Sequence, residues 1–86
     1  MAPSTDEFRE ELRSALNEAA RLGFVAVDVN AGNLHRRVGG YPGADHRMPA
    51  CCEALYSEMG PKDEVVEQPE GGKGASVTIR YVLPRS

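Results

Sequence analysis

Glycine and proline divide the 86-residue sequence into short segments, which restricts the chain to short helices and strands. Breaks fall at Gly23, at 39–40, at 60–61 and at 69–74. The longest nearly apolar run, at 24–29, is far below the roughly 20 residues that a membrane-spanning helix needs. Acidic residues follow the N-terminus, where a signal peptide carries positive charge. We therefore expect one cytoplasmic domain over 1–86, frayed at 1–4 and 84–86, that does not bind a membrane.

The first segment predicts a helix over 5–22. Ser4 and Glu7 have the spacing of a capping box, and Gly23 is typical of a helix C-terminus. The apolar residues recur at helical spacing and form one stripe. These residues are Phe8, Leu12, Ala15, Leu16, Ala19 and Leu22.

The second segment predicts a short strand and then a short helix. Residues 24–29 are rich in valine and alternate between two faces, which is typical of a strand. Asn30 is a good N-cap, so a helix over 31–38 is expected, ended by Gly39 and Gly40. Its exposed side is predicted to carry His35, Arg36 and Arg37.

A third helix is predicted from about residue 47 to Met59, with Pro49 in its first turn. The loop before it, at 39–45, is expected to be fixed by a packed Tyr41, with a part in a partner-binding surface as the alternative. The apolar stripe of the helix is predicted to be Cys51, Cys52, Leu55 and Met59. The last third is typical of a hairpin, with strands at 64–68 and 75–83 around a glycine-rich loop.

This order of segments resembles the winged helix-turn-helix family over nearly the whole chain. The resemblance implies an α+β fold in which three helices pack on a small three-stranded antiparallel sheet. It also implies that the strand at 24–29 pairs with the final hairpin. A small α+β domain with the same elements and no helix-turn-helix geometry is the alternative.

The resemblance further implies binding of double-stranded DNA, with the third helix in the major groove and the loop at 70–74 on the backbone. His46 and Arg47 would lie at the start of that helix, with Ala50, Glu53, Ala54 and Ser57 facing the groove. Arg36 and Arg37 would contact phosphates, and Lys73 would lie at the tip of the loop. The nucleic-acid-binding residues predicted in this way are Arg36, Arg37, His46, Arg47, Ala50, Ser57, Lys73 and Arg80.

Charge is distributed unevenly along the chain. The formal net charge is −3, but residues 30–50 carry three basic residues and one acidic residue, and residues 71–86 carry three basic residues and none that is acidic. These are the two segments that the implied DNA contact uses. Acidic residues at 51–70, Glu53 and Glu58 among them, repel phosphates. They support the alternative of a protein-interaction adaptor with a basic partner, and a homodimer through the first helix is also considered.

The cysteines and histidines do not form a recognised catalytic or metal-binding motif. Cys51 and Cys52 are adjacent, which disfavours both a disulfide and a zinc site. A thiol near a helix N-terminus also leaves a redox role open. No nucleophile motif accompanies His35 and His46. We expect no enzymatic activity, no cofactor and no metal.

Overall fold

Helix α1 (Thr5–Arg21) begins and ends as its sequence predicts. The Ser4 side chain accepts from the Glu7 N–H, and the Glu7 carboxylate accepts from the Ser4 N–H, so the capping box is complete. At the other end Gly23 has a φ of 94°, and Phe24 N–H donates to the Ala19 carbonyl. This left-handed glycine turn ends the helix and fixes the direction of the chain that follows.

Strand β1 (Ala26–Asn30) leads directly into helix α2 (Ala31–Val38). The Asn30 side chain accepts from the Asn33 N–H at 3.1 Å and caps the helix, as predicted. The strand begins two residues later than predicted, because the Phe24 N–H is used in the turn after α1.

Helix α3 (Met48–Ser57) is shorter than predicted, because the chain leaves the helix at Glu58. The computed structural model describes residues 3–39 and 47–84, so the expected loop with Tyr41 and the residue His46 lie outside the described residues.

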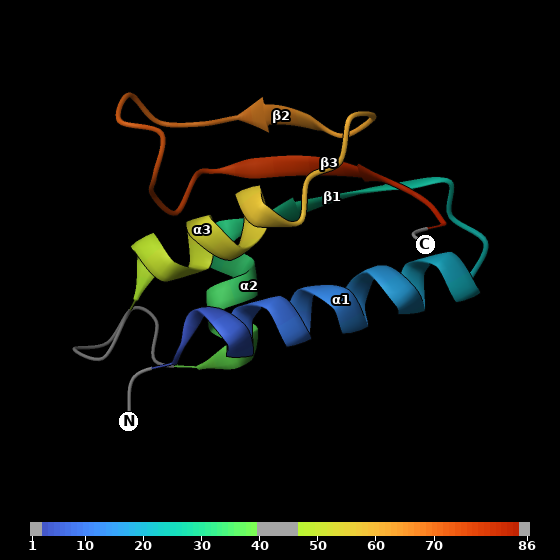
Figure 1. Ribbon diagram of the computed structural model, residues 1–86, viewed down its shortest axis with the longest axis horizontal. Helices are drawn as coiled ribbons and strands as arrows, with labels where there is room; N and C mark the ends of the chain where they lie inside the picture. Colours follow the sequence, from blue (N-terminus) through green and yellow to red (C-terminus); the bar gives the residue numbers. More distant parts are fainter. Residues whose placement is uncertain (1–2, 40–46, 85–86) are drawn as a thin grey trace.

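Strands β2 (Glu64–Glu67) and β3 (Thr78–Val82) complete an antiparallel sheet in the order β1-β3-β2. The predicted pairing of the first strand with the hairpin is confirmed, with Val27 opposite Tyr81. The second hairpin strand was predicted over 75–83, but Ala75 and Val77 instead accept hydrogen bonds from the first turn of α2. The observed fold is therefore a small α+β fold with three helices and a three-stranded antiparallel sheet (Figure 1).

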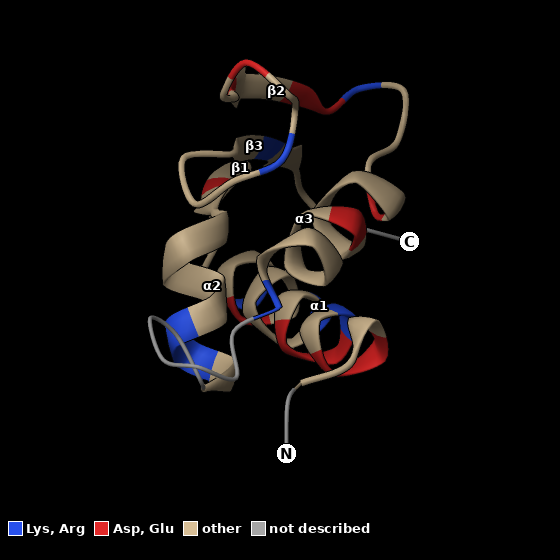
Figure 2. Ribbon diagram, turned by 90° about the vertical axis from the view of Figure 1, so that its left-hand side faces the viewer, with Lys and Arg blue, Asp and Glu red and all other residues tan. Residues whose placement is uncertain are grey.

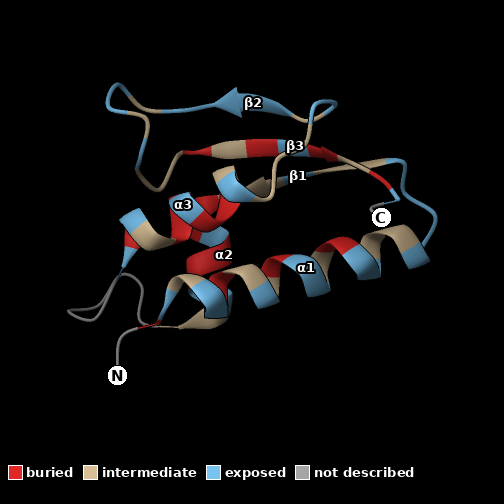
Figure 3. Ribbon diagram, in the orientation of Figure 1, coloured by how far each residue is buried: buried red, intermediate tan, exposed pale blue. Residues whose placement is uncertain are grey.

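The core lies between the sheet and the three helices, whose buried segments are drawn in red in Figure 3. Tyr81 is fully buried and its hydroxyl donates to the Leu55 carbonyl at 2.7 Å. Cys51 and Cys52 are buried, free thiols. The core also contains His35, which is fully buried, so the predicted exposed position of this residue is wrong. Over the described residues, the helices are too short or too polar to cross a bilayer.

Candidate nucleic-acid interface and an apolar groove

The buried His35 connects the last turn of α2 to the start of α3. Its Nε2 accepts from the Arg47 N–H at 2.7 Å, and its ring packs edge-on against Phe8 at 4.8 Å between centroids. No side chain caps α3 at Arg47. The imidazole therefore helps to hold the beginning of α3 beside α2, which is a positioning role that the sequence did not reveal.

Three exposed arginines gather around this junction, and we call them the arginine cluster: Arg36, Arg37 and Arg47. Figure 2 shows the basic end of α2 and the basic residue before α3 at the same end of the molecule. Arg37 Nη2 lies 2.6 Å from Glu11 Oε2, and Arg36 Nη1 donates to Asn33 Oδ1 at 3.0 Å. Arg47 forms no ion pair with any residue in the described part of the chain.

The loop at 68–74, which includes the predicted wing, is attached to α3. The Tyr56 hydroxyl donates to the Gly72 carbonyl at 2.5 Å, and Lys73 Nζ lies 3.1 Å from Glu53 Oε1. The Gly74 N–H donates to Cys52 Sγ at 3.3 Å. The loop is thus folded along the exposed side of α3, and the charge of Lys73 is already partnered.

The later turns of α3 are less accessible than predicted. Ala54 was expected to face the groove but is fully buried, and Ala50 packs against the core. Ser57 Oγ accepts from Arg9 Nε at 3.0 Å, which binds this end of α3 to α1. The amphipathic pattern misplaced Ala54 because α3 packs against both α1 and α2, and Tyr81 of β3 bonds to its Leu55 carbonyl, so more than one face is covered.

Arg80 is separate from the arginine cluster. It lies on β3 between two carboxylates, with Nε 2.8 Å from Asp28 Oδ1 and Nη1 3.3 Å from Glu64 Oε1. Its hydrogen bond lowers the pKa of Asp28, and the same contact raises the pKa of Arg80. The structure therefore places the elements that carry the arginine cluster beside one another but leaves Arg80 in an ion-pair network on the sheet.

The buried thiols have the chemistry of core side chains. Burial raises the pKa of the Cys51 thiol to about 12, and it also raises the pKa of Cys52. At neutral pH both groups are therefore protonated. Within residues 3–39 and 47–84, no three histidine, cysteine or acidic side chains are grouped as metal ligands would be.

A second surface was not identified from the sequence. Leu22, Phe24 and Val25 are 61%, 59% and 79% exposed, and we call these three residues the apolar turn. Leu22 and Phe24 line one end of a groove of about 660 Å³ that runs between α1 and β1 toward α2. Its apolar lining includes Ala15, Ala19, Val27, Val29 and Leu34. The sequence signal that could have revealed this surface was the presence of large apolar residues directly after Gly23, where the chain reverses direction.

No protein-family model, curated protein or solved structure matches this chain.

Proposed function

We propose that this chain is a winged helix-turn-helix domain that binds duplex DNA through the arginine cluster. The element order and the strand order β1-β3-β2 support this assignment, as does the direct passage from β1 through the Asn30 cap into α2. The chain departs from the simplest form of the motif at the connection between Val38 and Met48, which is longer than a three- or four-residue turn.

The observation that carries the proposal is the junction of α2 and α3. The His35–Arg47 hydrogen bond joins two elements that each bring exposed guanidinium groups to one end of the molecule. Guanidinium groups match phosphate geometry well and remain charged at physiological pH. An exposed ion pair such as Arg37–Glu11 contributes about 0–1 kcal/mol, so a phosphate can replace the carboxylate at little cost.

The proposed contact is narrower than the one predicted from the sequence. Only the first turn of α3 and the last turn of α2 approach the DNA backbone. The later turns of α3 are covered by the loop at 68–74, whose Lys73 pairs with Glu53. Lys73 takes part only when it leaves Glu53. Ser57 and Arg80 do not contribute, since both are engaged away from the cluster. His46 lies outside the described residues, and its contact with DNA stays a prediction from the sequence.

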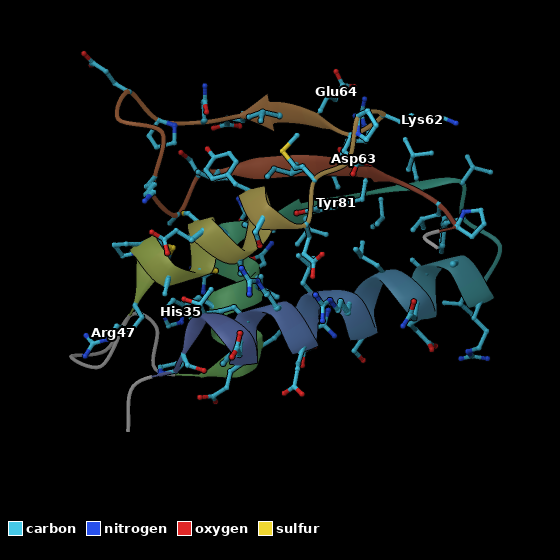
Figure 4. All side chains as sticks on the ribbon, viewed as in Figure 1. His35, Arg47, Lys62, Asp63, Glu64 and Tyr81 are labelled. Carbon is cyan, nitrogen blue, oxygen red and sulfur yellow. The ribbon has the colours of Figure 1, made fainter. Side chains whose placement is uncertain are left out.

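Fluorescence anisotropy with a short random-sequence duplex at low salt tests this proposal. Arg47→Ala is expected to weaken binding about 5-fold, and replacement of all three arginines about 50-fold. The slope of log affinity against log salt concentration should become shallower by about 1 for each phosphate contact that is lost. Lys62→Ala is the matched control, because Lys62 is exposed and lies at the opposite end of the molecule (Figure 4). Equal losses in Lys62→Ala and Arg47→Ala would contradict a localised contact.

The adaptor is a second candidate, favoured by the number of cations that are already neutralised. Glu53, Glu58 and Glu64 pair with Lys73, Arg13 and Arg80, so acidic groups interrupt the basic surface. Such a surface suits a protein partner better than a polyanion. In the same titration, no binding of the parent up to high micromolar protein concentration would reject DNA binding and favour the adaptor.

A further inference from the structure

We propose that the groove between α1 and β1 binds a second copy of this chain, with the apolar turn of each copy filling the groove of the other. The proposal does not depend on DNA binding, because the apolar turn and the edge of β1 carry it, and only Arg37 is shared with the arginine cluster. It assigns a role to the largest exposed apolar side chains of the described residues.

The apolar turn is held in a fixed direction and is not a loose loop. Gly23 adopts a left-handed conformation that few other residues tolerate, and the Phe24 N–H is bonded to the Ala19 carbonyl. On the far side, the Val25 carbonyl accepts from the Leu83 N–H at 2.9 Å. Phe24 and Val25 are therefore presented to solvent from a backbone that is bonded on both sides.

The groove offers a polar wall as well as an apolar floor. The Val25–Leu83 bond continues the β1–β3 ladder, in which bonds recur at every second residue. The N–H and C=O groups of Ala26 and Asp28 therefore point away from β3, and both residues line the groove. An extended segment that lies there can pair with these groups while its side chains cover the valines of β1.

Self-complementarity makes a second copy the occupant. The apolar turn lies at one end of β1, and the groove extends along β1 toward Leu34. A two-fold axis that places the two β1 strands antiparallel brings each apolar turn over the partner's groove. One patch thus supplies both the projecting and the receiving surface, as a symmetric dimer requires.

Local charge permits this contact although each chain carries a net charge of −3. The charged residues that line the groove are Glu18, Asp28, Arg37 and Arg80, two of each sign. Glu18 is paired with Arg21 and Asp28 with Arg80, so neither carboxylate is isolated. A locally neutral, apolar patch is suited to its own copy and offers little attraction to a polyanion.

The proposed dimer leaves the start of α3 uncovered, although Arg37 of the arginine cluster lines the groove. The connection from α1 to β1 lies at the opposite end of the molecule from the start of α3 (Figure 1). Because the patch is small, we expect an interface below about 1,200 Å² and a dissociation constant on the order of 10–100 µM. Self-association should therefore be reversible and depend on concentration.

Sedimentation velocity of the full chain over a concentration series up to the millimolar range tests the proposal. The parent should shift from monomer to dimer, and Val25→Arg should weaken association at least 10-fold. Val66→Arg is the matched control, because Val66 is an exposed valine on the opposite edge of the sheet. It should associate as the parent does. Circular dichroism should confirm that both variants fold.

Amide NMR spectra of the parent at increasing concentration supply a test that needs no variant. Resonances of the apolar turn and of β1 should shift, whereas those of the first turn of α3 should not. A parent that remains monomeric at millimolar concentration would overturn the proposal. So would a dimer that Val25→Arg leaves intact or that Val66→Arg weakens equally.

Discussion

The two ends of this molecule expose opposite kinds of surface. At the α3 end the exposed groups are charged, and most are already partnered within the chain, as in the Arg37–Glu11 and Lys73–Glu53 pairs. At the far end of α1 three large apolar side chains are exposed, and most of the surface of Phe24 and Val25 is uncovered.

This difference indicates which surface contributes more binding free energy when a partner covers it. A phosphate that binds the α3 end replaces existing ion pairs, so its net contribution is small for each contact and depends on salt. Burial of apolar surface at the other end has no competing contact within the chain and contributes about 25 cal/mol per Å². The two ends should therefore respond separately to mutation, and the following changes test that separation.

The largest expected effect is at the junction of α2 and α3. His35→Ala removes a fully buried ring and leaves the Arg47 N–H without its imidazole acceptor, so it should lower the free energy of unfolding by about 2–4 kcal/mol. Urea unfolding measures this loss. Arg36→Ala, at the next and exposed position, should change stability by less than about 0.5 kcal/mol. Equal effects of the two variants would refute the positioning role of His35.

Gly23→Ala should affect the other end. Nothing lies within 4 Å of an added Cβ, but the φ of 94° is strained for alanine, which should cost about 1–2 kcal/mol. Gly71→Ala is the control, because Gly71 has the same open space without a positive φ. Thermal unfolding should show a loss for the first variant only. Gly23→Ala should also weaken self-association and leave DNA affinity unchanged.

Tyr56→Phe should release the loop at 68–74 from α3. Loss of the hydrogen bond to the Gly72 carbonyl should cost about 1 kcal/mol and increase hydrogen exchange in the loop. Tyr81→Phe makes the same chemical change in the core, where the hydroxyl bonds to Leu55. It should lower stability without a local increase of exchange in the loop. If the loop amides exchange at the same rate in both variants, the Tyr56 hydroxyl does not hold the loop.

The smallest effect concerns Asp28, on the wall of the groove. Its hydrogen bond with Arg80 lowers its pKa in the folded state, so the stability that this pair contributes is present above the unfolded pKa of about 3.9. That contribution is lost as the pH falls through the lower folded value. NMR titration of the carboxyl carbon should give a pKa below the ordinary value, and Arg80→Ala should restore it. An unchanged titration in Arg80→Ala would contradict this assignment.

Local signals in the sequence were enough to predict most element boundaries. The reciprocal bonds of Ser4 and Glu7, the Asn30 cap and the positive φ of Gly23 depend on residues within a few positions of each other. The sheet pairing was not a local signal: it was expected from the resemblance to the winged helix-turn-helix family, and β1 does pair with β3. The end of α1 additionally shortened β1 by using the Phe24 N–H.

The candidate sites depended on contacts between distant segments. Arg36, Arg37 and Arg47 were singled out from the sequence by their charge, but their acidic neighbours were not visible there. Glu11 is far from Arg37 in sequence, and Glu53 is far from Lys73. Of the apolar turn, Leu22 was assigned to the apolar stripe of the first helix, and Phe24 and Val25 to a strand, because periodicity alone does not show which side chains remain uncovered.

The sequence by itself thus determined the order of the helices and strands and the caps of α1 and α2, since caps, turns and periodicity act over a few residues. Only the tertiary structure decided which side chains are buried, paired or exposed. His35 lies beside two arginines in sequence, yet it is buried because Phe8 and the start of α3 enclose it. Phe24 is as apolar as Phe8, yet it is exposed because no element of the described chain covers the turn after α1.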